Sequence, residues 1–314
     1  GASGISFFLM KPLLQQKQVE EARRLLDAEA YDEAIKKTHK VLNSNRATNL
    51  LAAEAMLTAE AAFIHGKALY FIAGKKADDA TKEDKLVAAG YLQMSYRIAG
   101  FPPQDRSEGL NLLAKSILEA GHPTASLPYW EELLLRKDVD SGKKIECVKS
   151  IYKIYLQDPA LDANQGMQSL DSYLTQAVLN SDERNLALLD KATLLLRAKR
   201  WDEGLKTLEK IGDPESRSAR WLLLNGRLDL GQTMALDDKG ELSEEKKSEA
   251  YGRVSETLDD PKIRGSERLD DEDEAFYFRA ISLARLGERE RALDIFKQIR
   301  LDRPDEPIGW LAWL

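Results

Sequence analysis

The chain has 314 residues, 43% of them hydrophobic and 32% charged, with a formal net charge of −7 at pH 7. This acidic balance argues against non-specific nucleic-acid binding, because phosphate contacts need clustered lysines and arginines. Cys147 is the only cysteine, which excludes an internal disulfide framework but leaves the cellular compartment open. The sequence lacks a long alternation of Val, Ile and Thr typical of strands, and its apolar residues recur near the helical period.

The first third of the chain predicts two helix pairs. The first pair covers residues 13–43, and its second helix opens at Tyr31. The second pair begins with a long Ala-rich helix over 47–73, followed by a polar insert from Gly74 to Asp84. Its partner helix ends near Gly100, where Phe101-Pro102-Pro103 breaks the pattern.

The remaining two thirds predict five more pairs, which gives an all-α chain of about seven antiparallel helix pairs. Two of these pairs are expected to carry irregular polar segments, an insert from Thr233 to Ser243 and an acidic linker from Asp270 to Glu274. The five pairs are 106–136 with a turn at Gly121-His122-Pro123, 141–157 with 164–180, 184–212, 217–258, and 272–301.

Small, aromatic and turn residues recur through these pairs at matching positions. Ala192 and Gly226 lie one period of 34 residues apart, each in a first helix. The clearest run is Phe276, Ala280, Gly287, Ala292, Phe296 and Pro304. Fainter copies are Leu188, Ala192, Trp201, Gly204 and Leu208; Ala22, Leu25, Tyr31 and Ala34; and Leu110, Ala114, Gly121 and Trp130. By this pattern the chain resembles the tetratricopeptide-repeat family, with divergent repeats.

The resemblance implies a right-handed α-solenoid over residues 13–305. Residues 1–12 are apolar from Ile5 to Met10, and Lys11 and Pro12 are expected to end this stretch. Two interpretations stand for residues 1–12: a staple packed on the first pair, or the remnant of a removed signal anchor. Residues 306–314 are expected to start a further helix, which either caps the array or is truncated.

The sequence contains no recognisable catalytic, cofactor or metal motif. His39, His65 and His122 have no second ligand at helical spacing, so they are interpreted as two partly exposed helix residues and one turn residue. Cys147 is interpreted as a buried, inert thiol. No phosphate-binding loop or nucleophile elbow is present. We therefore expect no enzyme activity, no cofactor and no metal within this chain.

In the tetratricopeptide family the first helix of each pair lines a concave, partner-binding face. Ala192, Gly226 and Ala280 set the register of this chain against the family's repeat. The resemblance then implies these lining positions: Arg197, Arg220, Leu223, Arg227, Tyr277, Ile281 and Arg285. Arginines around an apolar floor suit an extended or helical partner segment with acidic groups. The alternative is that these arginines pair with nearby acids of the chain itself. Asn225 lies one residue off the register of the family's chaperone-tail clamp, which argues against that role.

The resemblance implies a non-catalytic scaffold that binds a protein or peptide segment. Two other hypotheses stay open: a regulatory or substrate-recruiting arm of a larger enzyme, and a membrane-tethered envelope assembly factor. A membrane is expected only through an anchor preceding Gly1, so both a cytoplasmic chain and a membrane-anchored extracytoplasmic repeat domain are consistent with the sequence.

Overall fold

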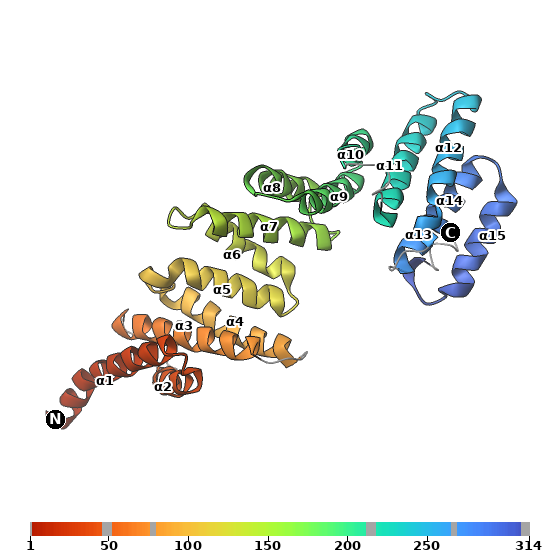
Figure 1. The fold of residues 1–314 in the computed structure, drawn as a ribbon. Coiled ribbons are helices and arrows are strands. Elements are labelled where there is room, and N and C mark those ends of the chain that lie inside the picture. The colour runs from red at the N-terminus through yellow and green to blue at the C-terminus, as the bar shows by residue number, and fades with distance from the viewer. Residues whose placement is uncertain (1, 46–51, 76–79, 212–217, 265–268, 309–314) are drawn as a thin grey trace. The chain divides into compact units, whose positions relative to one another are not determined.

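The computed structural model describes residues 2–45, 52–75, 80–211, 218–264 and 269–308 (Figure 1). The chain forms two compact units, Gly1–Ile154 and Tyr155–Leu314. Every regular element in the described ranges is a helix. The predicted all-α class is therefore confirmed.

The first unit contains three helix pairs and most of a seventh helix. Its elements are α1 (Ala2–Asp27), α2 (Tyr31–Ser44), α3 (Ala52–Gly74), α4 (Ala80–Ala99), the 3₁₀ turn η1 (Pro103–Asp105), α5 (Arg106–Glu119), α6 (Pro123–Leu135) and α7 (Ser141–Gln157), whose last residues belong to the second unit. Within the unit, α1 packs on α2, α3 on α4 and α5 on α6, and successive pairs also touch. Figure 1 shows these pairs in red to yellow.

The second unit is also built of helices that pack in pairs. Its elements are α8 (Ala163–Gln176), α9 (Ser181–Arg197), α10 (Trp201–Leu208), α11 (Ala219–Asp238), α12 (Glu244–Leu258), the short α13 (Pro261–Arg264), α14 (Leu269–Arg285) and α15 (Arg289–Asp302). Three pairs pack internally, α9 with α10, α11 with α12 and α14 with α15, and α11 and α12 both contact α14. Helices α11, α12, α14 and α15 lie side by side in Figure 1, coloured from teal to blue.

Contacts along the pair of α11 and α12 establish that these two helices are antiparallel. Between α11 and α12, Asp237 accepts a hydrogen bond from Tyr251, and Asp229 binds Arg253. Nearer the start of α11, Gly226 lies against Leu258 at the end of α12. Residues later in α11 therefore contact residues earlier in α12, so the two helices run in opposite directions, as expected for a helix–turn–helix unit.

Small residues sit where two helices approach most closely. A Cβ atom added to Gly226 would lie 2.5 Å from Leu258 Cδ2, and one added to Gly204 would lie 2.5 Å from Leu228 Cδ2. Ala280 and Ala292, two small residues of the clearest repeat run, are both buried in one cluster with Leu283. The repeat positions chosen from the sequence thus mark real contacts, because only a small side chain fits there.

Three segments differ from the prediction. The expected insert from Thr233 to Ser243 begins later, because α11 continues to Asp238 with Thr233 buried and Met234 packed on the core. The expected acidic linker from Asp270 to Glu274 is the first part of α14, where acidic groups favour a helix N-terminus. The end of the insert from Gly74 to Asp84 is also helical, since α4 starts at Ala80.

The N-terminal segment is continuous with the first pair. Helix α1 runs from Ala2 through Pro12 to Asp27, so the expected break at Lys11 and Pro12 does not occur. The predicted boundary at residue 12 therefore falls inside a helix. At the other end, residues 309–314, including Trp310, Leu311 and Trp313, lie outside the described part of the chain.

Candidate functional site: an apolar groove between α9, α11 and α14

The first helices of the pairs in the first unit are joined by ion pairs. Each ion pair connects the first helix of one helix pair to the first helix of the next. The nitrogen–oxygen distances are 2.7–2.8 Å. They are Arg23 with Glu60, Lys67 with Glu108, and Lys115 with Glu146. Acids and bases on this face therefore neutralise one another between neighbouring repeats.

The second unit has a different feature in the corresponding place, a groove of about 580 Å³. It is bordered by α9, α11 and α14, with the start of α10 at one side. Its lining comprises Leu196, Arg197, Lys199, Trp201, Arg227, Leu230, Gly231, Met234, Ala235, Asp238, Tyr277, Phe278 and Ile281.

The floor of the groove is made of partly exposed apolar side chains. Trp201, Met234, Phe278 and Ile281 all pack on one side against the core of the second unit. A Cβ atom on Gly231 would come within 2.8 Å of the Trp201 ring, so the indole lies directly on the backbone of α11. These residues form an apolar trough supported from below by packed side chains.

Arg227 crosses from α11 to α14. Its Nη1 atom donates to Glu274 Oε2 at 2.8 Å, and its guanidinium lies 4.7 Å from the centroid of the Phe278 ring. The Nε atom is buried and has no hydrogen-bond acceptor among the described residues. Arg227 thus contributes a positive charge and a flat guanidinium surface beside the aromatic floor.

Arg197 serves the fold as well as the groove. Its guanidinium donates to the backbone carbonyls of Tyr155, Asp158 and Leu161 at 2.6, 2.9 and 3.0 Å, and to that of Leu156 at 3.4 Å. These carbonyls lie at the end of α7 and in the turn after it, where a helix leaves acceptors unsatisfied. The hydrogen bonds of Arg197 are therefore directed into the scaffold.

The rim of the groove is more basic than acidic. Lys199 is exposed just after α9 and has a φ of +56°, a conformation that closes the helix end. Asp238 is the acidic residue of the lining, and Arg285 Nη1 lies 3.2 Å from its Oδ1. With Arg197 and Arg227, the rim carries three basic groups against one acid in a chain of net charge −7.

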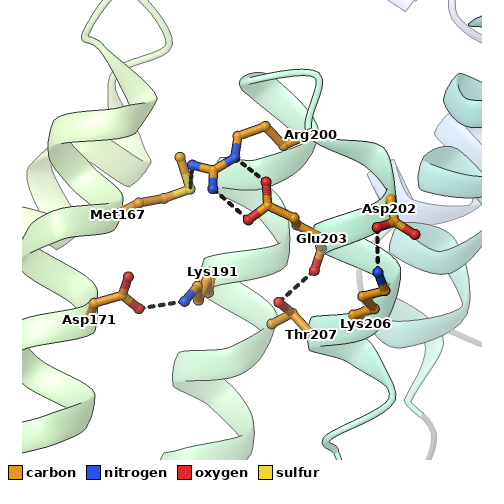
Figure 2. A network of polar contacts seen from close by, with 8 residues as sticks. All are labelled: Met167, Asp171, Lys191, Arg200, Asp202, Glu203, Lys206 and Thr207. Carbon is orange, nitrogen blue, oxygen red and sulfur yellow. Dashed lines mark hydrogen bonds and ion pairs between the residues drawn. The ribbon is translucent and has the colours of Figure 1, made fainter.

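A network of polar contacts holds the start of α10, which carries Trp201 (Figure 2). Arg200 binds both carboxylate oxygens of Glu203, at 2.6 and 2.5 Å, and lies 3.9 Å from the sulfur of Met167 on α8. Lys191 of α9 binds Asp171 of α8 at 2.5 Å. The network thereby ties α8, α9 and the start of α10 together.

Four of the seven predicted lining residues border the groove: Arg197, Arg227, Tyr277 and Ile281. The other three do not. Leu223 is buried in the core, and Arg220 turns toward α9, where Nη2 lies 3.1 Å from the buried Asp190 Oδ1. Arg285 is bound to Asp238 and to Asp237.

The two α11 arginines among the predicted lining residues, Arg220 and Arg227, bind carboxylates on different helices. They are two turns apart on α11, but Arg220 contacts α9 whereas Arg227 contacts α14. The alternative that the arginines pair with acids of the chain describes Arg220, Arg227 and Arg285. Arg197 follows neither interpretation, since its hydrogen-bond partners are carbonyls.

The sequence interpretation did not identify Trp201, Met234 and Phe278 as lining residues. Trp201 lies on a second helix, and only first helices were expected to line the face. Met234 was assigned to an insert. The spacing of Arg227, Leu230 and Met234 at i, i+3 and i+7 could have identified this stripe of α11.

Residues able to perform acid–base, thiol or metal chemistry are scattered. Cys147 is buried, and desolvation raises the pKa of its thiol to about 11. His65 is buried against Thr38, not partly exposed as expected, and desolvation lowers its pKa to about 4. Among the described residues, no group of three or more His, Cys, Asp or Glu could hold a metal ion. No described helix is long and apolar enough to span a bilayer.

Three solved structures align with most of this chain at low sequence identity and with TM-scores below 0.5. No protein-family model matches the chain, and no curated protein matches it. The C-terminal part of a TPR repeat-containing protein from Cytophaga hutchinsonii is 11% identical, with a TM-score of 0.47, covering 94% of this chain and 98% of that one. The TPR domain of P58(IPK) is 16% identical, with a TM-score of 0.32, covering 95% and 77%.

The TPR2AB domain of yeast Sti1, solved in a complex with pHSP90, is 12% identical, with a TM-score of 0.31 and coverage of 96% and 99%. All three are tetratricopeptide-repeat structures, as the sequence pattern predicted.

Proposed function

We propose that the chain is a protein-interaction scaffold that binds a segment of a partner protein in the groove bordered by α9, α11 and α14. The observation that carries this proposal is the convergence of partly exposed apolar side chains on one cavity of about 580 Å³. A partly exposed apolar surface gains free energy when a partner covers it, and such patches mark interaction sites.

The contrast with the first unit supports this location. There, basic and acidic side chains of successive first helices bind one another, and exposed pairs of this type contribute little to binding. In the second unit, the aromatic rings of Trp201 and Phe278 and the thioether of Met234 face the groove. Aromatic residues and methionine are the residue types enriched at protein interfaces.

The proposal leaves the larger context of the chain open. A groove of this kind suits a free-standing scaffold, a substrate-recruiting arm of a larger enzyme, or an envelope assembly factor equally well. In each case the role assigned to this chain is binding.

A selection from random peptides tests the proposal. The intact chain is used to select binders from a display library of random peptides about 20 residues long, sufficient for roughly five helical turns. Met234→Glu places a charge on the apolar floor, and Leu186→Glu is the matched control, because Leu186 is 57% exposed on α9 outside the groove.

Selected peptides should bind the wild-type chain and the Leu186→Glu variant with similar affinity. Met234→Glu should weaken binding about tenfold or more, as expected for a central interface residue. Thermal unfolding of both variants verifies that the fold is intact. Peptides that bind the Met234→Glu chain as tightly as the wild type would refute the groove as the binding site.

A further inference from the structure

The polar groups of the groove are largely engaged within the chain. Arg197 donates to backbone carbonyls, Arg227 binds Glu274, and Asp238 pairs with Arg285. Besides the buried Nε of Arg227, the lining offers the Lys199 ammonium, the Trp201 indole N–H and the Tyr277 hydroxyl as side-chain groups able to form hydrogen bonds. The groove therefore offers few partners to the main chain of a bound segment.

The small number of free hydrogen-bonding groups in the lining discriminates between an extended and a helical ligand. An extended segment buried in the groove would leave main-chain N–H and C=O groups without partners, at about 1–3 kcal/mol for each unsatisfied group. A helix satisfies these groups internally and presents only side chains. The lining thus favours a helical segment.

The apolar residues are arranged as a trough that matches one face of such a helix. Trp201 comes from α10, Met234 from α11, and Phe278 and Ile281 from α14, so the apolar floor extends across three elements. An amphipathic helix carries apolar side chains at i, i+3, i+4 and i+7 along a single stripe. A stripe of this kind can fill a trough, whereas one isolated side chain would leave part of it exposed to water.

The charges of the rim indicate what flanks the stripe. Lys199 is exposed, and no ion pair joins it to any residue in the described ranges. The guanidinium of Arg197, whose hydrogen-bond partners are neutral carbonyls, adds to the positive potential there, whereas the charge of Arg227 is offset by Glu274. Complementarity favours an aspartate or glutamate of the partner beside Lys199.

We propose that the groove binds an amphipathic helix of a partner protein, with its apolar stripe on Trp201, Met234 and Phe278 and an acidic residue beside Lys199. This inference rests on the function proposed above and specifies the conformation and chemistry of the ligand. The binding mode is that of a helix in a groove, in which side chains supply both affinity and specificity.

The peptides selected from the random library test the inference directly. Their apolar residues should recur at the helical period, with Asp or Glu enriched on one flank, and circular dichroism should record helix formation on binding. Replacing a central solvent-facing residue of a selected peptide by proline should weaken binding at least about tenfold relative to alanine at the same position.

The acidic flank is tested on the chain itself. Lys199→Glu should weaken binding of the selected peptides about tenfold, and Lys199→Gln should have an intermediate effect. Lys210→Glu is the matched control, because Lys210 is exposed after α10 and outside the groove lining. An unchanged affinity in Lys199→Glu would overturn the assignment of the acidic partner residue.

The two proposals fail in distinguishable ways. Groove-dependent peptides that tolerate proline and lack helical periodicity would overturn the helical ligand while leaving the binding function in place. Peptides insensitive to Met234→Glu would overturn the groove itself. A selection that yields no groove-dependent binder would overturn both.

Discussion

The indole ring of Trp201 lies directly on Gly231, where a Cβ atom would approach ring atom Cε3 to 2.8 Å. This contact brings the start of α10 onto the middle of α11 and presents part of the ring to the groove. A glycine inside a helix lowers helix stability, so its place here is explained by the ring that it admits. The packing of α10 on α11 and the shape of the groove thus depend on the same pair of residues.

Gly231→Ala should therefore destabilise the second unit and weaken peptide binding. The displaced indole should cost about 1–3 kcal/mol, more than the gain of up to about 1 kcal/mol from higher helix propensity. Gly252→Ala is the control, since nothing lies within 4 Å of a Cβ at Gly252, and it should stabilise the chain by about 0.5–1 kcal/mol. Urea unfolding measures both effects, and a Gly231→Ala chain more stable than wild type would contradict the close contact.

Replacing Arg197 by alanine should destabilise the second unit by about 1–3 kcal/mol, because carbonyls at the end of α7 lose their donor. The stability of Arg197→Lys should lie between those of the wild type and Arg197→Ala, since an ammonium has three donors and lacks the planar fork of a guanidinium. The matched control is Arg184→Ala on exposed α9 surface, expected within about 0.5 kcal/mol of wild type. Equal unfolding midpoints for the Arg197→Ala and Arg184→Ala chains would show that the carbonyl contacts contribute nothing.

A large side chain at Ala292 should overpack the contact between α14 and α15. Ala292 is buried beside Ala280 and Leu283, and Ala292→Trp should cost about 1–3 kcal/mol. Because helix pairs support mainly their neighbours, hydrogen exchange should show lost protection in α14 and α15 while α1 to α6 stay protected. Leu293→Trp, at an adjacent position that is 54% exposed, should leave protection unchanged. Uniform loss along the whole chain would refute local coupling.

The buried His65 predicts a dependence of stability on pH. Desolvation, with a smaller contribution from His39, lowers the pKa of His65 from 6.5 to about 4 in the folded chain. The unfolded chain therefore binds a proton that the folded chain excludes between these values, so the stability from this residue is complete above about pH 6.5 and is lost toward pH 4. Wild type should lose about 2 kcal/mol from this source between about pH 7 and pH 5.

The measurement is urea unfolding of the wild type and a His65→Gln variant at the two pH values. The variant should show a smaller pH-dependent loss than the wild type, whatever its absolute stability. His122→Gln, in an exposed turn before α6, should retain the wild-type dependence. The same pH dependence in wild type and His65→Gln would disprove the role of His65.

The helix pairs could be predicted because the turn glycines and small residues in the sequence lie where the structure has turns and close helix contacts. Gly121 and Gly287 have φ values of +89° and +85°, the conformation that a turn glycine supplies between two helices. Ala280 and Ala292 mark close helix contacts. In contrast, the polar run after Thr233 and the acids before Ala275 predicted loops, because their charged partners on other elements are not visible along the sequence. Arg227 and Arg303, for example, bind Glu274 and Asp273 at the start of α14.

The groove was only partly predictable for a related reason. The residues Trp221 to Leu224 of α11 are all buried, so this helix packs on several sides and has no single lining face near its start. Leu223 was therefore assigned to the face although it belongs to the core. The spacing of residues along a helix shows which side chains share a face. It does not show which neighbouring helix that face contacts, because tertiary packing decides this. Arg220 and Arg227 share a stripe and still contact different helices.

The ion pairs between first helices of the first unit have a consequence for how such a sequence can change over generations. Arg23 and Glu60 stand 37 residues apart in the chain, about one repeat, and the members of the other two pairs are 41 and 31 residues apart. A single charge reversal in such a pair opposes like charges, whereas a second reversal in its partner restores attraction. Substitutions at these positions should therefore accumulate as compensating couples at a spacing near one repeat, and homologues could exchange the sign of a pair while retaining the same stack of helices.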